Sequence, residues 1–335
     1  MKKSLRLSLI VVMLQTVITI NVFATIWNVS NIDNSANFKS LMAAHDSEKV
    51  IAGDTLYVYG STLNYDGEFI CKKMLNIIGP GYFLNENQET QANITPAKIG
   101  IIEFSPGSEG SSISGMSISK LYIYCNNITI KRNNILISSN DQYGINLVRE
   151  GEIQNIIIVQ NFINARNGIH FASASNHIMI FNNIIKSVGH TIYMHSNDYA
   201  IIKNNVLYGN MRVYNSTFYN NIRSGGGTVD LVDSDVQYNL DYGTKFGTIN
   251  GNMVNVDMST VFIGQGSEDG KWQLAENSPA KNAGDNGVDC GAFDGTDPYI
   301  LSGIPMLPSI YYLNVPAIAS EISGLPVHIK IKSRN

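Results

Sequence analysis

The sequence predicts an all-β solenoid, a single-stranded right-handed parallel β-helix, from three observations. First, an asparagine followed two residues later by a β-branched aliphatic residue recurs five times, led by Asn133, Asn161, Asn182, Asn204 and Asn220. Second, an amide or acid stands six residues before four of these asparagines, at Asn127, Asn155, Asn176 and Asp198. Third, the repeat is rich in Ile, Val and Asn and has no helical period, so it can bury its apolar face only against copies of itself.

Stacking of this repeat buries the asparagine side chains, which must then form hydrogen bonds with one another. Equivalent side chains on successive parallel coils lie about 4.8 Å apart, so a buried amide can hydrogen-bond to the amides above and below it. We therefore expect Asn133, Asn161, Asn182 and Asn204 to form one file along an edge of the coil. A right-handed coil is expected because parallel crossover connections are strongly biased to that hand.

The first 24 residues are predicted to be a secretory signal peptide. A basic start precedes an apolar stretch from residue 7 to 20, and small residues precede a cleavage point after Ala24. The apolar stretch is short for a membrane span. We expect a secreted protein (periplasmic, cell-surface or extracellular) with no integral membrane segment once the signal is removed.

The N-terminal cap is expected to span residues 25–55. Within it, Phe38, Leu41 and Met42 have the spacing of an amphipathic helix between residues 35 and 50, with Ser35 or Asn37 as its N-cap. Such a helix would cover the apolar end of the first coil.

The β-helix is expected to span residues 56–295, with the polar segment 85–96 leaving the wall as an excursion. Residues 296–335 form a proline-rich tail or small β cap, because five of the nine prolines lie beyond Asp294 and proline is excluded from central strands. Alternation over 310–315 and 327–331 predicts two short strands there, expected to cover the last coil.

The charge balance argues against a nucleic-acid partner. The chain has 23 basic and 27 acidic residues, a formal net charge of −4, and loss of Lys2, Lys3 and Arg6 with the leader makes this −7. The cysteines, Cys71, Cys125 and Cys290, lack metal-ligand spacing. No metal site is predicted from them.

Several segments resemble a known family. They are Ala52-Gly53-Asp54-Thr55-Leu56, Ile78-Gly79-Pro80-Gly81-Tyr82, the Asn-x-Ile repeats, and the closing run that includes Val261-Phe262, Trp272-Gln273-Leu274, Ser278-Pro279-Ala280, Ala283-Gly284 and Asp289-Cys290-Gly291-Ala292-Phe293. Together they resemble the right-handed parallel β-helix proteins of the pectate-lyase-like superfamily, in the secreted bacterial version. The resemblance implies the fold and secretion. It does not imply one activity, because members include lyases, hydrolases, epimerases and proteins with no known reaction.

Catalytic motifs of that superfamily are mostly missing. Where a polygalacturonase-like protein has Gly-His-Gly, this chain has Gly189-His190-Thr191, and Ile201-Ile202-Lys203 lacks the arginine of Arg-Ile-Lys. Asp230, Asp233 and Asp235 could bind calcium as in pectate lyases, but they do not match those proteins position by position. No cofactor is therefore predicted; calcium is kept as an alternative, and a solvated acidic loop is the preferred interpretation.

The strand before each repeat predicts the candidate site. If the first and third residues of each strand point inward, the second and fourth point outward. One outward column is then Tyr122, Asn146, His170, Tyr193 and Arg212, and the other is Tyr124, Val148, Ala172, His195 and Tyr214. Tyrosine faces can pack on sugar rings, and histidine can move protons near neutral pH.

Two functions remain open. In the first, a polysaccharide lyase uses His170, Tyr193 or His195 as base, with Arg212 or Arg166 neutralising a uronate carboxylate. Tyr122, Tyr124, Asn146, Arg166 and Tyr214 would then bind substrate. In the second, a glycan-binding or surface structural protein uses the same wall without catalysing a reaction. Exposed tyrosines do not by themselves indicate catalysis, because cross-strand packing favours them on any sheet surface. The columns contain no carboxylate, so a two-acid glycoside hydrolase has no visible pair.

Overall fold

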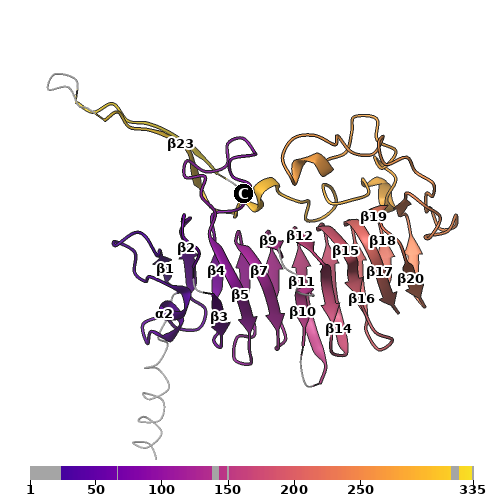
Figure 1. Cartoon of the computed structure of the whole chain (residues 1–335), viewed down its shortest axis with the longest axis horizontal. Helices are drawn as coiled ribbons and strands as arrows, with labels where there is room; N and C mark the ends of the chain where they lie inside the picture. Colours follow the sequence, from indigo (N-terminus) through magenta and orange to yellow (C-terminus); the bar gives the residue numbers. More distant parts are fainter. Residues whose placement is uncertain (1–23, 66, 138–142, 149–150, 318–323, 334–335) are drawn as a thin grey trace, which may run out of the picture.

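The computed structural model is a parallel β solenoid (Figure 1). It describes residues 24–65, 67–137, 143–148, 151–317 and 324–333, so the predicted signal peptide lies outside the described residues except for Ala24. One wall of the coil, called wall A here, is a 10-stranded sheet. Its strands, in spatial order, are β1 (Ile26–Val29), β2 (Thr55–Val58), β4 (Asn76–Ile78), β6 (Ser112–Ser114), β8 (Thr129–Lys131), β11 (Ile153–Val159), β14 (Ser175–Phe181), β16 (Ala200–Lys203), β18 (Thr217–Tyr219) and β21 (Asp235–Gln237).

The second sheet has 12 strands and pairs along two separate files. Four long strands belong to both files: β5 (Lys98–Phe104), β7 (Ser117–Ile123), β15 (Ile184–Tyr193) and β17 (Val206–Tyr214). Wall B contains their first halves with β9 (Asn134–Leu136), β12 (Phe162–Ala165), β19 (Ile222–Gly225) and β22 (Leu240–Asp241). Wall C contains their second halves with β3 (Glu68–Cys71), β10 (Tyr143–Leu147), β13 (Asn167–Phe171) and β20 (Val229–Val232).

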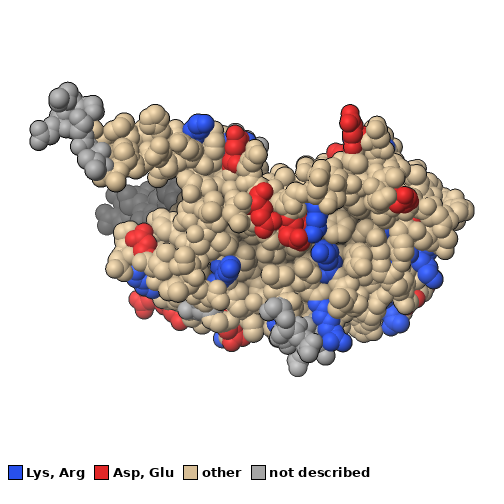
Figure 2. Space-filling model, turned by 45° about the horizontal axis from the view of Figure 1, so that its top comes forward, with Lys and Arg blue, Asp and Glu red and all other residues tan. Residues whose placement is uncertain are grey.

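The surface of the coil is mostly uncharged. On the side shown in Figure 2, basic and acidic residues form small groups within a large uncharged area, in keeping with the 15% of charged residues in the chain. Among the described residues, no helix combines the length and the apolar character needed to cross a membrane.

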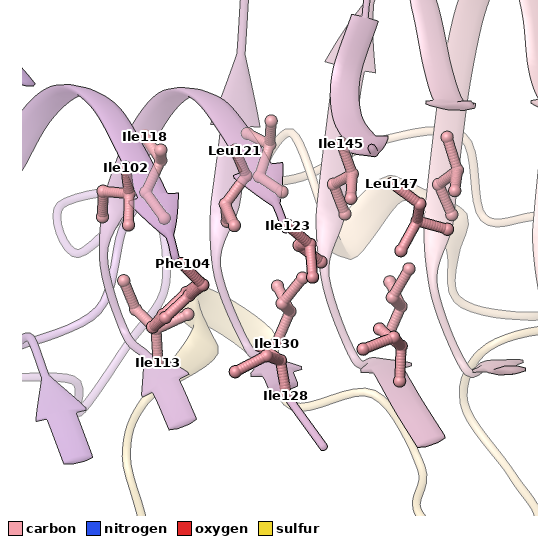
Figure 3. Close-up of a cluster of buried hydrophobic side chains, with 14 of the residues drawn as sticks. Ile102, Phe104, Ile113, Ile118, Leu121, Ile123, Ile128, Ile130, Ile145 and Leu147 are labelled. Atoms are coloured by element: carbon pink, nitrogen blue, oxygen red, sulfur yellow. The ribbon is translucent and has the colours of Figure 1, made fainter. Parts of the chain in front are cut away.

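The core consists of stacked aliphatic side chains (Figure 3). On wall A the inward column is isoleucine in six consecutive coils, and all six side chains are fully buried: Ile77, Ile113, Ile130, Ile158, Ile180 and Ile202. Burying one such side chain contributes roughly 1.5–3 kcal/mol. Because each coil can bury this face only against its neighbours, stability depends on correct stacking.

The asparagine file exists, but its register differs from the expectation. The ladder is Asn133, Asn161, Asn183, Asn205, Asn221, Asn239 and Asn252. In each step the backbone N–H and Nδ2 of one asparagine both donate to Oδ1 of the next, as from Asn161 to Asn183 at 2.9 and 3.0 Å. The expectation that Asn182 and Asn204 continue the file of Asn133 and Asn161 is therefore wrong by one residue.

The residue before each ladder asparagine turns the corner. Arg132, Gln160, Asn182, Asn204 and Asn220 all have φ between +53° and +58°, a left-handed conformation that asparagine tolerates better than most residues. The first of each asparagine pair thus makes the turn, and the second makes the ladder.

The segment after β22 first adds a partial coil, in which Met253 bridges Leu240 and Asn252 ends the ladder, and then runs back along the corner residues. Over residues 242–304 there is no strand, only three short 3-10 helices, η1 (Gly270–Trp272), η2 (Asp285–Gly287) and η3 (Leu301–Gly303). Its carbonyls accept hydrogen bonds from the corner side chains: Asn204 bonds Asp289 O, Asn182 bonds Ala292 O and Arg132 bonds Ile304 O. We call residues 242–304 the strap; it lies along the upper edge of the coils in Figure 1.

The N-terminal helix is shorter than expected. Helix α2 spans Leu41–Asp46, and its N-cap is Ser40, whose Oγ accepts from the N–H of Ala43; the expectation of Ser35 or Asn37 as the cap is wrong. Leu41 and Ala44 are buried in the main core.

The C-terminal strands form as expected, but not at the expected place. Strands β23 (Ser309–Asn314) and β24 (His328–Lys332) pair as an antiparallel hairpin. The expectation that this unit covers the last coil is wrong, because Ile310 O accepts from Ala92 N and Lys332 pairs with Glu89, both in the early excursion. The hairpin projects from that end of the molecule (Figure 1).

Candidate functional site

The candidate site is a column of side chains on wall C. Strand register places Tyr122, Asn146, His170, Tyr193 and Arg212 at equivalent positions of consecutive strands, as expected from the alternation. The column extends further than the sequence indicated, to Glu103 before Tyr122 and to Asp230 after Arg212. We call the residues from Glu103 to Asp230 the wall C column.

The inward and outward positions of wall C are clearly separated. The inward residues between the column members are fully buried, for example Leu147, Phe171 and Val213. The column members are half-buried, so their polar ends reach the surface while their rings or stems pack side by side. In the neighbouring second column, Tyr124, Val148 and Tyr214 are half-buried, and Ala172 and His195 are exposed.

His170 lies at the centre of the column and is held on two sides. Its Nδ1 is 2.8 Å from Oδ1 of Asn146, so the Nδ1–H tautomer donates to the amide and leaves the lone pair on Nε2. The ring of Tyr143 stacks on the imidazole, with centroids 4.0 Å apart and an interplanar angle of 11°. The orientation of His170 is therefore set by a hydrogen bond and a stacking contact.

A second group surrounds Tyr193. The guanidinium of Arg212 lies 5.3 Å from the centre of the Tyr193 ring and donates from Nη1 to the phenol oxygen at 3.2 Å. Arg212 also pairs with Asp230, Nε to Oδ2, at 3.3 Å. The rings of His190 and His195 approach Tyr193 edge-on at 4.9 and 5.3 Å. This cation, phenol and imidazole cluster is continuous with His170, whose ring centroid is 5.5 Å from that of Tyr193.

The protonation of these groups follows from their surroundings. Burial, assisted by the nearby charge of His195, lowers the pKa of His170 to about 4, so the imidazole is neutral at pH 7. Burial and then the charge of Arg212 lower the pKa of His190. The hydrogen bond that Arg212 donates to Asp230 is the first cause that raises the pKa of Arg212 above its usual value. The column thus presents the neutral imidazole of His170 near a permanent cation, Arg212.

Asp198 has a structural position below this surface. Its two carboxylate oxygens accept from the N–H groups of His195 and Ser175 at 2.5 and 3.0 Å. Burial raises the pKa of Asp198 to about 6, although both N–H donors act in the opposite direction. The carboxylate fixes the turn after His195 and is turned away from the outward column.

The structure brings together some of the expected residues and separates others. His170, Tyr193, His195, Arg212 and Asn146 form one contact group. Tyr122 and Tyr124 stack on each other, with centroids 6.2 Å apart, towards the N-terminal end of the column. Tyr214 lies beyond Arg212 on the same strand. Arg166 is exposed at the corner between walls B and C, where its carbonyl accepts from Gly189 N.

Three contributors were missed in the sequence. Glu103 could have been found by extending the alternation one coil towards the N-terminus. Tyr143 and His190 reach the group from positions before the outward column, and no periodicity identifies them because the strand register shifts near His190. Asp230, considered above only as a calcium ligand, pairs with Arg212. In the described part of the chain, no three His, Cys, Asp or Glu side chains are arranged to hold a metal ion.

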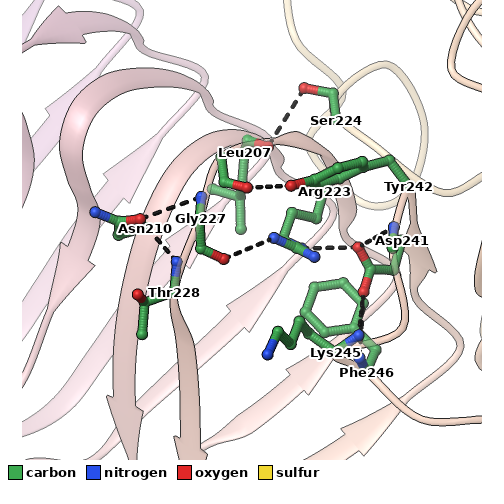
Figure 4. A network of polar contacts seen from close by, with 12 residues as sticks. Leu207, Asn210, Arg223, Ser224, Gly227, Thr228, Asp241, Tyr242, Lys245 and Phe246 are labelled. Atoms are coloured by element: carbon green, nitrogen blue, oxygen red, sulfur yellow. Dashed lines mark hydrogen bonds and ion pairs between the residues drawn. The ribbon is translucent and has the colours of Figure 1, made fainter.

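A second polar cluster at the end of the coil has a structural role (Figure 4). Arg223 occupies the inward column of wall B and is almost completely buried, 2.7 Å from Oδ1 of the buried Asp241. Asp241 also accepts from the N–H groups of Gly243 and Lys245, and the Tyr242 ring covers the guanidinium at 4.5 Å. A buried, fully bonded ion pair thus closes the apolar column.

These features define the class: a parallel β solenoid with one open wall of stacked aromatic and polar side chains. No family model, curated protein or solved structure matches the chain. Its function must therefore be argued from the site itself.

Proposed function

We propose that this chain is a secreted, right-handed parallel β-helix protein that binds a uronate-containing polysaccharide along wall C. The observation that supports this is the unbroken wall C column, in which rings, an amide, imidazoles and a guanidinium follow one another at the strand spacing of about 4.8 Å. Tyrosine and histidine rings offer faces to sugar rings, and half-burial holds them in place at little further entropy cost.

The charge distribution favours an acidic sugar at one end of the column. Arg212 carries a permanent charge near the neutral imidazole of His170, and its partner Asp230 is partly solvent-exposed. An exposed pair of this kind is weak, worth about 0–1 kcal/mol, so a uronate carboxylate can share or replace that contact. The net negative charge of the chain opposes loose binding of polyanions, which makes binding depend on Arg212.

Binding is tested by affinity electrophoresis in gels that contain polygalacturonate, alginate or a neutral galactan. We expect retardation by an acidic polymer, and loss of about tenfold in affinity, equivalent to ~1.4 kcal/mol, in Tyr193→Ala and Arg212→Gln. Tyr199→Ala is the matched control, because Tyr199 is an exposed tyrosine beside wall A. The proposal would be refuted if no acidic polymer changed the mobility of the protein, or if Tyr199→Ala lost as much affinity as the wall C variants.

A lyase is the second candidate, favoured by the Nε2 lone pair of His170. In this hypothesis Nε2 takes the proton from the carbon beside the uronate carboxylate, which Arg212 neutralises. The carbon–oxygen bond to the leaving sugar breaks as the double bond forms, and the phenol of Tyr193 gives its proton to the leaving oxygen. By strand spacing, His170 and Arg212 lie about 10 Å apart with Tyr193 between them, so a single sugar unit must bridge them.

The lyase is tested by ultraviolet absorbance of unsaturated products over the same polysaccharides, with and without calcium. His170→Gln should abolish any product while retaining most of the binding. If the protein binds these polysaccharides but forms no unsaturated product from any of them, with or without calcium, a lyase activity on those substrates is excluded and the glycan-binding function is retained.

A further inference from the structure

A hollow in the described part of the chain lies away from wall C. A pocket of about 650 Å³ opens over the first coils of wall B, within the range typical of small-molecule sites. Its floor includes Lys98, Ser117, Ser119 and Asn134 on strands β5, β7 and β9. Its sides are formed by two parts of the excursion, residues 82–85 and 94–96.

The pocket lies where the outward column of wall B changes character. Under the strap this column is apolar, with Phe162, Ile184 and Val206 packed against Tyr82, Ala292 and Tyr299. One coil earlier the same position is Asn134, and before it come Ser117 and Lys98. If another segment of the chain packed on this part of wall B, we would expect the outward column to remain apolar. The polar side chains therefore indicate a different role for this surface.

Asn134 provides the strongest evidence of a ligand. The residue is 6% exposed, and its Oδ1 is buried without a hydrogen-bond partner anywhere in the described residues. Native structures rarely leave such an atom unsatisfied. Since Asn134 lines the pocket, a turn of its side-chain amide would bring Oδ1 to a donor group in that space and complete its bonding.

Phe83 adds an independent observation. This residue also lines the pocket and has φ of +49°, a left-handed conformation that is uncommon for a bulky side chain. Its ring is fixed edge-on by Tyr82 and Phe162, with both centroid distances 5.2 Å. Backbone strain of this kind concentrates at ligand-binding sites.

We propose that this pocket binds a small sugar acid. Hydroxyl groups of the sugar donate to Oδ1 of Asn134 and exchange hydrogen bonds with Ser117 and Ser119, and one apolar ring face packs on Phe83. The carboxylate pairs with Lys98, the only charged residue among those that line the pocket. This site is separate from wall C and does not depend on the function proposed for it.

The test is calorimetric titration of the full mature chain with D-galacturonate and D-glucuronate, with D-galactose and D-glucose as neutral counterparts and acetate as a charge-only probe. We expect the sugar acids to bind more tightly than the neutral sugars, and acetate not to bind. Asn134→Val and Lys98→Gln should each weaken binding of the acids at least tenfold. Lys98→Gln should also remove the preference for acids over neutral sugars.

Two control variants separate this site from its surroundings. Asn164→Val makes the same substitution on the next strand of wall B, at a residue that pairs with Leu136 and does not line the pocket. Tyr193→Ala alters wall C, and both variants should bind the sugar acids normally. Because Asn134→Val restores the apolar column, its thermal midpoint should be equal to or above that of the wild type. If it fails to fold, the exposed Lys98→Gln still decides the outcome. Absence of heat with all four sugars, equal binding of acetate, or normal binding by both pocket variants would overturn the proposal.

Discussion

Replacing Asn183 by alanine tests the ladder at its centre. Nδ2 of Asn183 donates to Ile158 O, Phe181 O and Asn205 Oδ1 at 2.9–3.0 Å. Its Oδ1 accepts from both N and Nδ2 of Asn161. In Asn183→Ala the three hydrogen bonds from its Nδ2 are lost, at about 0.5–1.5 kcal/mol each, and the backbone N–H of Asn161 stays buried without an acceptor, at about 1–3 kcal/mol. Nδ2 of Asn161 keeps its bonds to Ile130 O and Val159 O. The expected loss is therefore about 4 kcal/mol, a large part of the 5–15 kcal/mol typical of a folded protein.

The adjacent Asn182 provides the matched comparison. Its side chain bonds only the strap, at Ala292 O and Asp294 O, and its φ of +55° suits glycine. Asn182→Gly should cost about 1–2 kcal/mol, since two net hydrogen bonds are lost and no strain is added. The losses of unfolding free energy on substituting these two adjacent asparagines are thus expected to differ severalfold.

Both variants are measured by equilibrium urea unfolding at fixed pH. Far-UV circular dichroism follows the strands, while the fluorescence of Trp27 and Trp272, the two tryptophans, follows the first coil and the strap. Coincident transitions are required, because stacked repeats can unfold in parts. A loss below 1 kcal/mol for Asn183→Ala, or a larger loss for Asn182→Gly, would refute the ladder register and its energetics.

Further predictions concern buried charges. Arg223→Met should destabilise by about 3–5 kcal/mol because it leaves Asp241 buried and unpaired. Adding Asp241→Leu should restore only part of the loss, because the N–H groups of Gly243 and Lys245 then lose their acceptor, as urea unfolding of both variants would reveal. For His170, NMR titration should give a pKa of about 4. Since the unfolded state takes this proton first, folding stability should fall as pH drops from 6.5 to 4, and His170→Gln should remove that contribution. For Asp198, with a pKa of about 6 in the folded state, the sign is opposite: its contribution should decrease as pH rises from 4 to 6, and an Asp198→Asn variant should lack this slope.

The middle of the wall C column, from Tyr122 to Arg212, could be predicted residue by residue because two independent signals agree. Alternation assigns each side chain to the inside or the outside, and the recurring asparagine motif aligns one coil with the next although the coils differ in length. The only residues missed inside the contact group, Tyr143 and His190, lie where pairing is irregular or outside the alternating stretch.

The ladder register could not be predicted because asparagine suits two adjacent positions. It favours the left-handed corner and it also favours the stacked amide file. In Asn182-Asn183 and Asn204-Asn205 both positions are asparagine, so the motif alone cannot assign them. The earlier coils contain the missing information, since Arg132 and Gln160 occupy the corner before the single ladder residues Asn133 and Asn161.

The strap explains why the two candidate sites lie where they do. Residues 242–304 have no strand period that would reveal their course, yet their path decides which surface of the coil stays open. Wall B is apolar for as long as the strap covers it, and it becomes polar at Asn134, where the strap ends against Tyr82. Wall C is not covered by the strap, and the wall C column is polar or aromatic from Glu103 to Asp230. Both proposals therefore place their ligands on parts of the coil that the strap leaves open, and the binding experiments test whether the polar side chains there act on a ligand or only face solvent.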